Sequence, residues 1–377
     1  MEQSSLKIAM ITPQWLKTRG GPTTYVSNLV AELRRAGHEV YVLTSEAGEG
    51  AIQLRGGLFK RILCTYRHLT ILKPDIVHIH GRANYILPAW LYKIFSNRKS
   101  NIVITFHTMP SVKRFLSFAP KAPRDYDRFK RVLARFLFRR CDSVVSVSES
   151  IVTALNRHYK IDIRNYSIIH SASSKLSINL TSMKSIQDHY ALHAYTPIFS
   201  TVGVMSWDWK VAGQQICIEA VDLLRKKFPN LRLLIAGDGE FREYLEDVVH
   251  QREMEHCIIF LGNVDFIPEL LKLSDIYVHM ALNEACPHAV IEAMHAGKPI
   301  IAANRGGIPE ILENGATGLL IEPSAEQLAQ TFERLIENKG EAERLAQNAA
   351  EYAISHLTWE AIAKKYLTVY QTNNCVS

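Results

Sequence analysis

The sequence lacks several features that mark whole classes of protein. Its six cysteines are scattered without a CxxC pair, which argues against a zinc site and a disulfide framework and fits a reducing compartment. No apolar run reaches the roughly 18 residues of a membrane-spanning helix; the closest, 86–95, contains Pro88 and Lys93. The first apolar stretch, 6–12, follows no basic residues and is too short for a signal peptide. We therefore expect a cytoplasmic protein.

Acidic residues are scarce in the first half of the chain. The 377 residues carry a net charge of +7, but residues 1–175 hold 28 Lys and Arg against 11 Asp and Glu, whereas the remainder holds 16 against 26. Net charges of +17 and −10 on the two halves suggest that the first half faces an anionic partner, such as a membrane surface or a lipid phosphate. No nucleic-acid motif accompanies the charge, so we expect no nucleic-acid partner.

Short β-branched runs alternate with helical patterns along the chain. The runs are apolar without clean alternation, as strands buried on both faces should be. In the first half we predict strands at 6–12, 39–45, 75–80, 101–106 and 143–147 and helices at 23–36, 84–96, 126–140 and 149–158. In the second half we predict strands at 198–204, 231–236, 257–261, 275–280, 298–303 and 318–321 and helices at 213–227, 240–254, 266–273, 287–296, 324–338, 341–356 and 358–371.

These two βαβ series predict an α/β protein with two tandem, doubly wound, Rossmann-like domains. We place the domains at 1–175 and 196–357, facing each other across a cleft, with 176–195 as a linker. The last segment, 358–377, is expected to pack back on the first domain. Sheets of this kind bind ligands beyond the carboxyl ends of their strands.

The segment NEACPHAVIEAMHAG at 283–297 carries the strongest chemical signal. Glu284 follows a predicted strand, and Pro287 suits the first turn of the helix behind it. The first backbone N–H groups of such a helix have no partner within it and can bind an anion. Glu284 at the helix start and Glu292 inside it could then accept hydrogen bonds from sugar hydroxyls. An isolated pair of this spacing is more often two solvated glutamates.

The surrounding motifs place the pair in a known pattern. The chain continues with GKPIIAANRGGIPE at 297–310 and NGATGLLIEP at 314–323, and is preceded by GDGE at 237–240 and FLGNV at 260–264. Together these segments resemble glycosyltransferase family 4, the retaining GT-B enzymes that use nucleotide sugars and carry an EX7E motif. The resemblance extends over almost the whole chain.

The resemblance implies a set of donor-binding residues in the second domain. Glu284 contacts hydroxyls of the donor sugar and acts in catalysis, and Glu292 contacts the ribose. The nucleobase lies near Val264, where main-chain atoms read it. Lys210 neutralises the pyrophosphate, which the loop before the helix also contacts through the backbone of Ala285, Cys286, Pro287 and His288.

The first domain supplies a second group of candidates. Gly20 and Gly21 follow the first strand, and two glycines let a backbone approach a ligand closely; the resemblance places them against the donor phosphates. His107 corresponds to a functional histidine near the donor sugar and the acceptor, although a lone histidine at a strand end is otherwise more often structural. His80, at the end of the preceding strand, is a weaker candidate for the lining of the acceptor cleft.

Two positions depart from the family pattern. Family members commonly carry an arginine where this chain has Val204, and Arg19 or Arg305 could supply the missing charge. The pair His170-Ser171 replaces the usual Asn-Gly, so no role is carried over there. A missing phosphate contact predicts weaker donor binding and leaves an inactive relative conceivable.

No metal ion or organic cofactor is expected. The Asp-X-Asp metal motif of the other large glycosyltransferase fold is absent at the predicted strand ends. The pair Asp125 and Asp127 lies at a helix start, where aspartate is common for electrostatic reasons. Backbone amides, the helix dipole and Lys210 would stabilise the departing diphosphate instead.

The segment 112–141 carries ten Lys and Arg. On a helical wheel of the predicted helix 126–140, one face is apolar: Tyr126, Phe129, Val132, Leu133, Phe136 and Leu137. The other face is basic: Arg128, Arg131, Arg135 and Arg139. A core-packed helix with a solvated face is the ordinary interpretation, but such faces normally mix signs. We expect this one to contact a membrane surface or the acceptor, each basic side chain contributing about 1 kcal/mol at an anionic leaflet.

These expectations combine into a retaining, metal-independent hexosyl- or related glycosyltransferase. Its acceptor would be a lipid-linked or polyanionic glycan in envelope polysaccharide or glycolipid synthesis, reached from the inner face of the membrane by a peripheral protein. Two alternatives stay open: another GT-B enzyme, such as a nucleotide-sugar epimerase or a phosphorylase, and a non-catalytic donor-binding subunit of an envelope assembly system.

Overall fold

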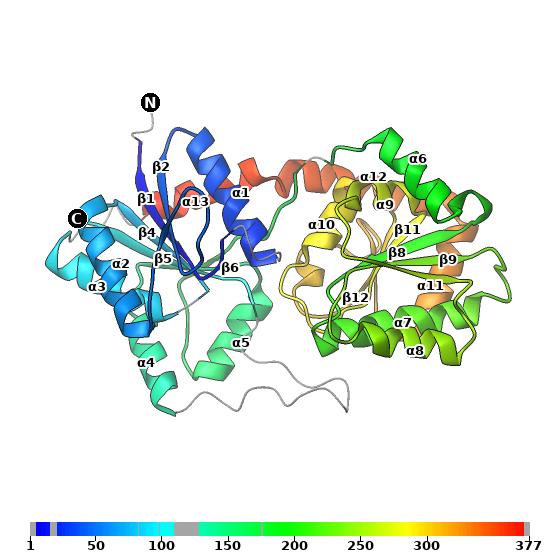
Figure 1. Cartoon of the computed structure of the whole chain (residues 1–377), viewed down its shortest axis with the longest axis horizontal. Coiled ribbons are helices and arrows are strands. Elements are labelled where there is room, and N and C mark those ends of the chain that lie inside the picture. Colours follow the sequence, from blue (N-terminus) through cyan, green and yellow to red (C-terminus); the bar gives the residue numbers. More distant parts are fainter. Residues whose placement is uncertain are drawn as a thin grey trace. The chain divides into compact units, whose positions relative to one another are not determined.

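The computed structural model describes residues 5–15, 21–81, 83–97, 99–108, 128–174 and 176–372. They divide into two compact units: unit 1 contains the described residues up to 172 together with 359–372, and unit 2 contains Ser173–Thr358. Each unit has one parallel sheet with helices on its faces (Figure 1). The predicted fold class, two tandem doubly wound α/β domains, is confirmed.

Unit 1 is built on a seven-stranded sheet in the order β3-β2-β1-β4-β5-β6-β7. Its central strands are buried along their whole length because helices cover both faces. The strands are β1 Lys7–Thr12, β2 Glu39–Thr44, β3 Ala51–Gln53, β4 Ile76–His80, β5 Asn101–Phe106, β6 Ser143–Ser146 and β7 Tyr166–Ile168. The helices are α1 Gly21–Arg35, α2 Leu58–Leu72, the 3-10 turn η1 Ala83–Tyr85, α3 Ile86–Phe95, α4 Arg128–Phe138, α5 Glu149–Tyr159 and α13 Trp359–Thr372.

Helix α13 belongs to unit 1 although it comes last in the sequence. It packs beside α1, and its Tyr366 and Tyr370 are fully buried (Figure 1). The Tyr366 hydroxyl lies 3.0 Å from the Tyr25 hydroxyl of α1, and the Asn101 amide of β5 donates to the Tyr370 carbonyl at 3.3 Å. These buried polar contacts fix α13 against the sheet as well as against α1.

Unit 2 is built on a six-stranded sheet in the order β10-β9-β8-β11-β12-β13. In Figure 1, α7 and α8 cover one face of this sheet and α9, α10 and α12 the other. The strands are β8 Ile198–Val202, β9 Arg232–Ala236, β10 Ile258–Gly262, β11 Ile276–His279, β12 Ile300–Ala303 and β13 Leu319–Ile321. The helices are α6 Leu180–His189, η2 Leu192–Ala194, α7 Asp208–Leu224, α8 Arg242–Gln251, α9 Ile267–Leu273, α10 His288–His295, η3 Ile308–Glu310, α11 Ala325–Glu337 and α12 Lys339–His356.

The segment expected to be a linker is folded onto unit 2. It contains α6, whose first turn is capped by Asn179: the Asn179 side chain accepts from the backbone N–H groups of Thr181 and Ser182. The backbone N–H of Asn179 itself donates to the Glu269 carboxylate of α9 at 2.7 Å. Helix α6 thereby packs on α9.

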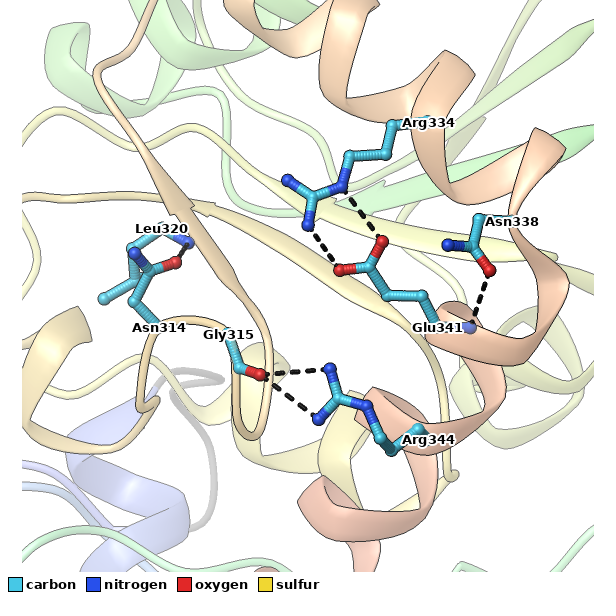
Figure 2. A network of polar contacts seen from close by, with 7 residues as sticks. All are labelled: Asn314, Gly315, Leu320, Arg334, Asn338, Glu341 and Arg344. Atoms are coloured by element: carbon cyan, nitrogen blue, oxygen red, sulfur yellow. Dashed lines mark hydrogen bonds and ion pairs between the residues drawn. The ribbon is translucent and has the colours of Figure 1, made fainter.

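Polar contacts hold the turn after η3 and the junction of α11 with α12 (Figure 2). Arg344 donates through both terminal nitrogens to the Gly315 carbonyl at 3.2 and 3.3 Å. Arg334 forms a two-pronged ion pair with Glu341 at 2.9 and 2.5 Å, and Asn338 caps α12 by accepting from the Glu341 backbone N–H. Arg344 therefore ties the motif NGATG at 314–318 to α12.

Candidate active site

The strand order of unit 2 reverses between β8 and β11. At such a point the connections leave in opposite directions, and the crevice at the carboxyl ends is the general ligand site of doubly wound sheets. Lys210, in the first turn of α7, comes after β8. His279 is the last residue of β11, and Glu284 lies in the loop behind it. The topology therefore brings these three side chains to one place.

Lys210 and Glu284 form an ion pair at this crevice. Lys210 Nζ lies 2.7 Å from Glu284 Oε1, and the Glu284 side chain is only 11% exposed. Burial raises the pKa of Glu284, but the charge of Lys210 and the neighbouring His279 outweigh it and lower the pKa to about 2. Glu284 is therefore an ionised acceptor of hydrogen bonds at neutral pH.

His279 is a third member of the cluster that the sequence prediction missed. Its Nε2 lies 3.5 Å from Glu284 Oε1, and its Nδ1 lies 3.1 Å from the hydroxyl of Tyr277 on the same strand. The ring of His279 therefore lies between the Tyr277 hydroxyl and the Glu284 carboxylate. A histidine at the end of the otherwise apolar run DIYVHM was the sequence signal for this role.

Two glycines allow the backbone to approach closely around the pair. A Cβ on Gly306, which has φ +58°, would lie 2.1 Å from the Glu284 carbonyl oxygen, and the next N–H, of Gly307, donates to that oxygen at 2.8 Å. A Cβ on Gly213 of α7 would lie 2.3 Å from the Met280 carbonyl oxygen. Any larger side chain at either position would displace the loop that carries Glu284.

A small cavity of about 10 Å³ lies beside the ion pair, which is room for one water-sized group. Its lining includes Thr201, Gly203, Lys210, Gln214 and His279. Gln214 is 4% exposed, and its Nε2 donates to the Gly203 carbonyl at 2.9 Å. Within the described parts of the chain its Oε1 has no hydrogen-bond partner. This crevice therefore offers a buried acceptor to a hydroxyl or a water.

Helix α10 begins four residues after Glu284 and carries the second glutamate. It begins at His288, directly after the loop formed by Ala285, Cys286 and Pro287. The positive end of the helix dipole lies at this loop. Glu292 is one turn inside α10, and burial raises the pKa of Glu292 to about 7. The two glutamates of one motif therefore differ in charge state near neutral pH.

Val264 follows β10 and packs its side chain against an apolar cluster. The cluster includes Leu234, Ala236 and Leu270. The side chain of Val264 is thus used in packing. The expectation that main-chain atoms at this position read a nucleobase stays a prediction.

The structure shows what surrounds the position of the missing arginine. Val204 lies in the loop after β8 and is 41% exposed. Arg305, one expected substitute, is engaged by a two-pronged ion pair with Glu322, in which one N···O distance is 3.0 Å. The other expected substitute, Arg19, lies outside the described residues. The charge of Arg305 is therefore already paired with a carboxylate, which reduces what it can offer to a phosphate.

The remaining candidates belong to unit 1. Gly21 is the first residue of α1, whereas Gly20 lies outside the described residues. His107 follows β5 and is half-buried, with its Nε2 2.8 Å from His80 Nδ1. His80 is 2% exposed, so it is a buried partner of His107 and does not line an open surface as the sequence led us to consider.

Comparison with known proteins decides the family. Residues 19–172 match the family described as Glycosyltransferase Family 4, and residues 196–352 match the family described as Glycosyl transferases group 1. The two matches cover most of unit 1 and most of unit 2. The chain belongs to the GT-B glycosyltransferases. The recognition of this family from the motifs at 237–323 is thereby confirmed at the level of fold and enzyme class.

Individual relatives match different shares of this chain. An uncharacterized glycosyltransferase of Methanocaldococcus jannaschii is 32% identical over 145 residues, which is 38% of this chain and 37% of that relative. N-acetyl-alpha-D-glucosaminyl L-malate synthase of Bacillus anthracis is 25% identical over 298 residues, covering 78% of this chain and 74% of the synthase. The crystal structure of Anabaena HepE in complex with UDP-glucose is 18% identical, covers 97% of this chain and 100% of that chain, and has a TM-score of 0.79.

Helix α4 of the glycosyltransferase differs from the predicted amphipathic helix. Of the expected apolar face, Leu137 is buried, but Val132, Leu133 and Phe136 are exposed. Phe136 instead packs edge-on against Trp90 of α3, with Arg140 above its ring at 4.6 Å. The helix is thus anchored at its carboxyl end and leaves apolar side chains at the surface.

The basic residues of α4 differ in how exposed their side chains are. Arg135 is half-buried, and its Nε donates to the Tyr159 carbonyl at the end of α5. This side chain therefore helps to hold α4 against α5. Arg139 is exposed. Arg128 and Arg131 belong to α4, but their side chains lie outside the described part of the structure.

The structure adds a surface helix that the sequence prediction missed. Along α2, Phe59, Leu63 and Ile71 are exposed at helical spacing, with Phe59 80% exposed, and Arg67 is exposed on the same stripe. Residues 50–74 contain no acidic residue. They contain five basic ones: Arg55, Lys60, Arg61, Arg67 and Lys73. An apolar stripe among only positive charges is typical of a surface that meets anionic lipid.

The described residues show neither a metal-binding cluster nor a membrane-spanning helix. No group of three or more His, Cys, Asp or Glu side chains there is arranged to hold a metal ion. Among the same residues, every helix is too short or too polar to cross a membrane.

Proposed function

We propose that this glycosyltransferase transfers a sugar from a nucleotide diphosphate sugar to a hydroxyl of its acceptor with retention of anomeric configuration and without a metal ion. The observation that carries the proposal is the Lys210–Glu284 ion pair at the switch point of the unit 2 sheet. It places one cation and one ionised carboxylate beside a helix start, which matches a ligand with a diphosphate at one end and sugar hydroxyls at the other.

Each donor contact follows from the chemistry of these groups. The Lys210 ammonium has three hydrogens, so it can keep Glu284 as one partner and take a diphosphate oxygen as another. The backbone at 285–288 and the positive end of α10 would hold the diphosphate. Glu284 would accept from sugar hydroxyls, and Glu292 from the ribose. The complex of Anabaena HepE with UDP-glucose, which shares the fold, supports a nucleotide sugar as donor.

The reaction needs no protein nucleophile. The bond from the anomeric carbon to the phosphate oxygen breaks while the acceptor hydroxyl bonds the same carbon on the same face. The hydroxyl proton passes to the departing phosphate oxygen. Lys210, the backbone N–H groups of Ala285, Cys286 and His288, and the α10 dipole would stabilise the charge on the diphosphate. In such sites fixed dipoles and charges are usually the largest catalytic contribution. His107 of unit 1 would act near the donor sugar and the acceptor, and Gly20 and Gly21 near the phosphates.

The acceptor we propose is a lipid-linked or polyanionic glycan, held by unit 1 at an anionic membrane surface. Residues 1–175 carry a net charge of +17, and α2 and α4 expose apolar side chains among basic ones. Those two features complement an anionic leaflet, where charge attracts and apolar side chains insert. The protein would then work as a peripheral protein on the cytoplasmic face, in envelope polysaccharide or glycolipid synthesis.

A second candidate function is a non-catalytic donor-binding subunit. Val204 in place of the family's usual arginine favours it, because one phosphate contact is missing. The ionised Glu284 paired with Lys210 favours an enzyme, because a carboxylate for sugar hydroxyls is kept. Turnover distinguishes the two, since both require nucleotide binding.

The test compares matched variants in nucleotide binding and in turnover. Nucleoside diphosphates and nucleotide sugars are first screened for stabilisation of the wild-type protein, since a ligand that binds only the folded state raises its melting temperature. Lys210→Met should then lose the stabilisation, whereas Lys226→Met, at an exposed lysine just after α7, should keep it. Glu284→Ala should lower turnover much more than nucleotide affinity. Equal small effects of Lys210→Met and Lys226→Met would contradict the assigned donor site.

A further inference from the structure

The histidines at the ends of β4 and β5 are joined edge to edge. These strands are neighbours, with His80 in register with Thr105, two residues before His107. His80 Nδ1 and His107 Nε2 are 2.8 Å apart, and the two rings are within 15° of parallel. One of the two nitrogens must carry the hydrogen of this bond, because two bare ring nitrogens at this distance would repel each other.

Met10 decides which nitrogen donates. His80 Nε2 lies 2.9 Å from Met10 Sδ on β1. A thioether sulfur has no hydrogen and can only accept, so a neutral His80 carries its hydrogen on Nε2. His80 is neutral because burial, and then the neighbouring His78 and His107, hold its pKa well below the ordinary value. The Nδ1 of His80 is therefore bare.

We propose that His80 is a positioning residue for His107: it accepts the hydrogen on His107 Nε2 and so fixes the tautomer and the ring plane of that histidine. In neutral His107 the nitrogen that can accept a proton is then Nδ1. The catalytic meaning of this assignment rests on the proposed function, in which His107 acts near the donor sugar and the acceptor. The tautomer itself does not depend on that function.

His78 shows that this arrangement is particular to His80. It lies two residues earlier on the same strand and is also fully buried. Its ring nitrogens contact the Tyr370 hydroxyl at 2.6 Å and the Thr105 hydroxyl at 2.7 Å. His78 therefore joins the strand to α13, whereas His80 joins Met10 to His107.

Tyr25 adds a second constraint on the same ring. Its ring packs edge-on against His107 with centroids 4.6 Å apart, and its hydroxyl is held by Tyr366 of α13. The ring of His107 thus lies between the ring of Tyr25 and the Nδ1 of His80. A buried acceptor of fixed geometry is how proteins commonly set the tautomer of a functional histidine.

The direct test is nitrogen NMR of the full-length protein labelled with ¹⁵N-histidine. Near neutral pH we expect His80 with its hydrogen on Nε2, and His107 with a hydrogen on Nε2 whether it is neutral or charged. In Met10→Leu, a substitution of similar volume that removes the sulfur, we expect a second His80 tautomer and a matching change at His107. A wild-type His107 whose hydrogen is on Nδ1 alone would overturn the proposal, as would an unchanged pattern in Met10→Leu.

Activity gives an independent readout once a donor and an acceptor are in hand. His80→Leu removes the acceptor and should lower kcat by about 10- to 100-fold with little change in the KM for the donor, because the misplaced group acts in the transition state. His80→Asn keeps an acceptor oxygen near the position of Nδ1 and should recover most of this loss. Equal losses in both variants would contradict a positioning role. If the NMR pattern holds but His107→Ala keeps full turnover, the tautomer assignment stands and the catalytic role of His107 fails.

Discussion

Glu284 and Glu292 show how two carboxylates of one motif acquire different chemistry from their surroundings. Glu284 has Lys210 and His279 as partners, so its pKa falls to about 2 despite burial. Glu292 is partly buried in α10, and desolvation raises its pKa to about 7. The two pKa values differ because Lys210 stabilises the charged form of Glu284, whereas desolvation disfavours the charged form of Glu292.

The raised pKa of Glu292 predicts a pH dependence of stability. A carboxyl group with a folded-state pKa of about 7 and an ordinary unfolded value binds its proton more tightly when folded. Its contribution to stability is therefore complete below pH 4.5 and is lost as the pH rises through 7, by at most about 3 kcal/mol. The free energy of unfolding should fall over this range in the wild-type protein. Glu292→Gln should remove this part of the fall in denaturant titrations; a parallel decline in both proteins would contradict the assignment.

A substitution at Val204 is predicted to strengthen nucleotide binding. Val204 is 41% exposed, so Val204→Arg can place its guanidinium in solvent without disturbing the core. A charge-assisted hydrogen bond to a phosphate is worth roughly 1.5–3 kcal/mol. Val204→Arg should therefore tighten binding of the nucleoside diphosphate by about tenfold or more, as measured by calorimetry. Unchanged affinity in a folded variant would mean that another cation already fills the place.

Among the elements, those with a strong apolar pattern could be predicted from the sequence. Strand β4, with the sequence IVHIH, is the clearest example. Its β-branched residues predict a strand, and the structure buries all five of its positions, including the two histidines. The motif loop and α10 could likewise be predicted, because proline and the spaced glutamates mark a helix start. These local signals do not depend on what the rest of the chain does.

The elements missed from the sequence depend on tertiary contacts. Helix α2 follows Gly56 and Gly57, begins without a capping side chain or an acidic first turn, and exposes its apolar stripe, so its pattern does not indicate a buried face. Helix α7 begins at Asp208, five residues before the predicted start, so that Gly213 lies inside it. That glycine is needed because the Met280 carbonyl occupies the space of a Cβ.

The site could be predicted only in part for the same reason. Glu284 and Lys210 were named through the family resemblance, but their pairing across 74 residues depends on the strand order around the switch point. His279 and His80 were missed or misplaced because their roles come from neighbours on other strands or loops. A histidine in a buried strand signals that a polar partner exists, but the partner itself is set by the fold.

Helices α2 and α4 are predicted to bind the protein to anionic membranes. Vesicles with acidic lipids should bind the protein, whereas neutral vesicles should not. Binding should weaken with salt, because the Debye length falls from about 10 Å at 0.1 M to 3 Å at 1 M. The combined change Phe59→Ser, Leu63→Ser and Arg67→Glu should reduce sedimentation with acidic vesicles strongly, as should Arg139→Glu to a smaller extent.

The matched control for this experiment lies in unit 2. Leu223 and Ile354 are similarly exposed apolar residues, on α7 and α12. Leu223→Ser with Ile354→Ser should leave vesicle binding unchanged. Absence of binding to acidic vesicles even at low salt would contradict the membrane surface, and the positive charge of unit 1 would then serve a soluble anionic acceptor.

At the scale of the whole molecule, charge and chemistry are divided between the two parts of the chain. Residues 1–175 are strongly basic, whereas the remainder, which holds Glu284 and Glu292, is acidic. In the proposed donor site the diphosphate would therefore be neutralised locally, by Lys210 and the start of α10, rather than by the overall charge of its own domain.

This division predicts that transfer needs no divalent cation. If an ammonium group and backbone amides compensate the diphosphate as proposed, turnover should be unchanged after dialysis against EDTA. A complete loss of activity that Mg²⁺ or Mn²⁺ restores would contradict the assignment of Lys210. The comparison should use a fixed ionic strength, since added salt alone also weakens phosphate contacts.

The central claim is that the protein is a retaining transferase that uses a nucleotide diphosphate sugar. The most direct measurement is the anomeric configuration of the first product, followed by proton NMR from the start of the reaction, before mutarotation or further transfer. The account predicts the same anomer in the product as in the donor, formed by the wild-type protein and nearly absent with Glu284→Ala. A product of the opposite anomer would contradict it.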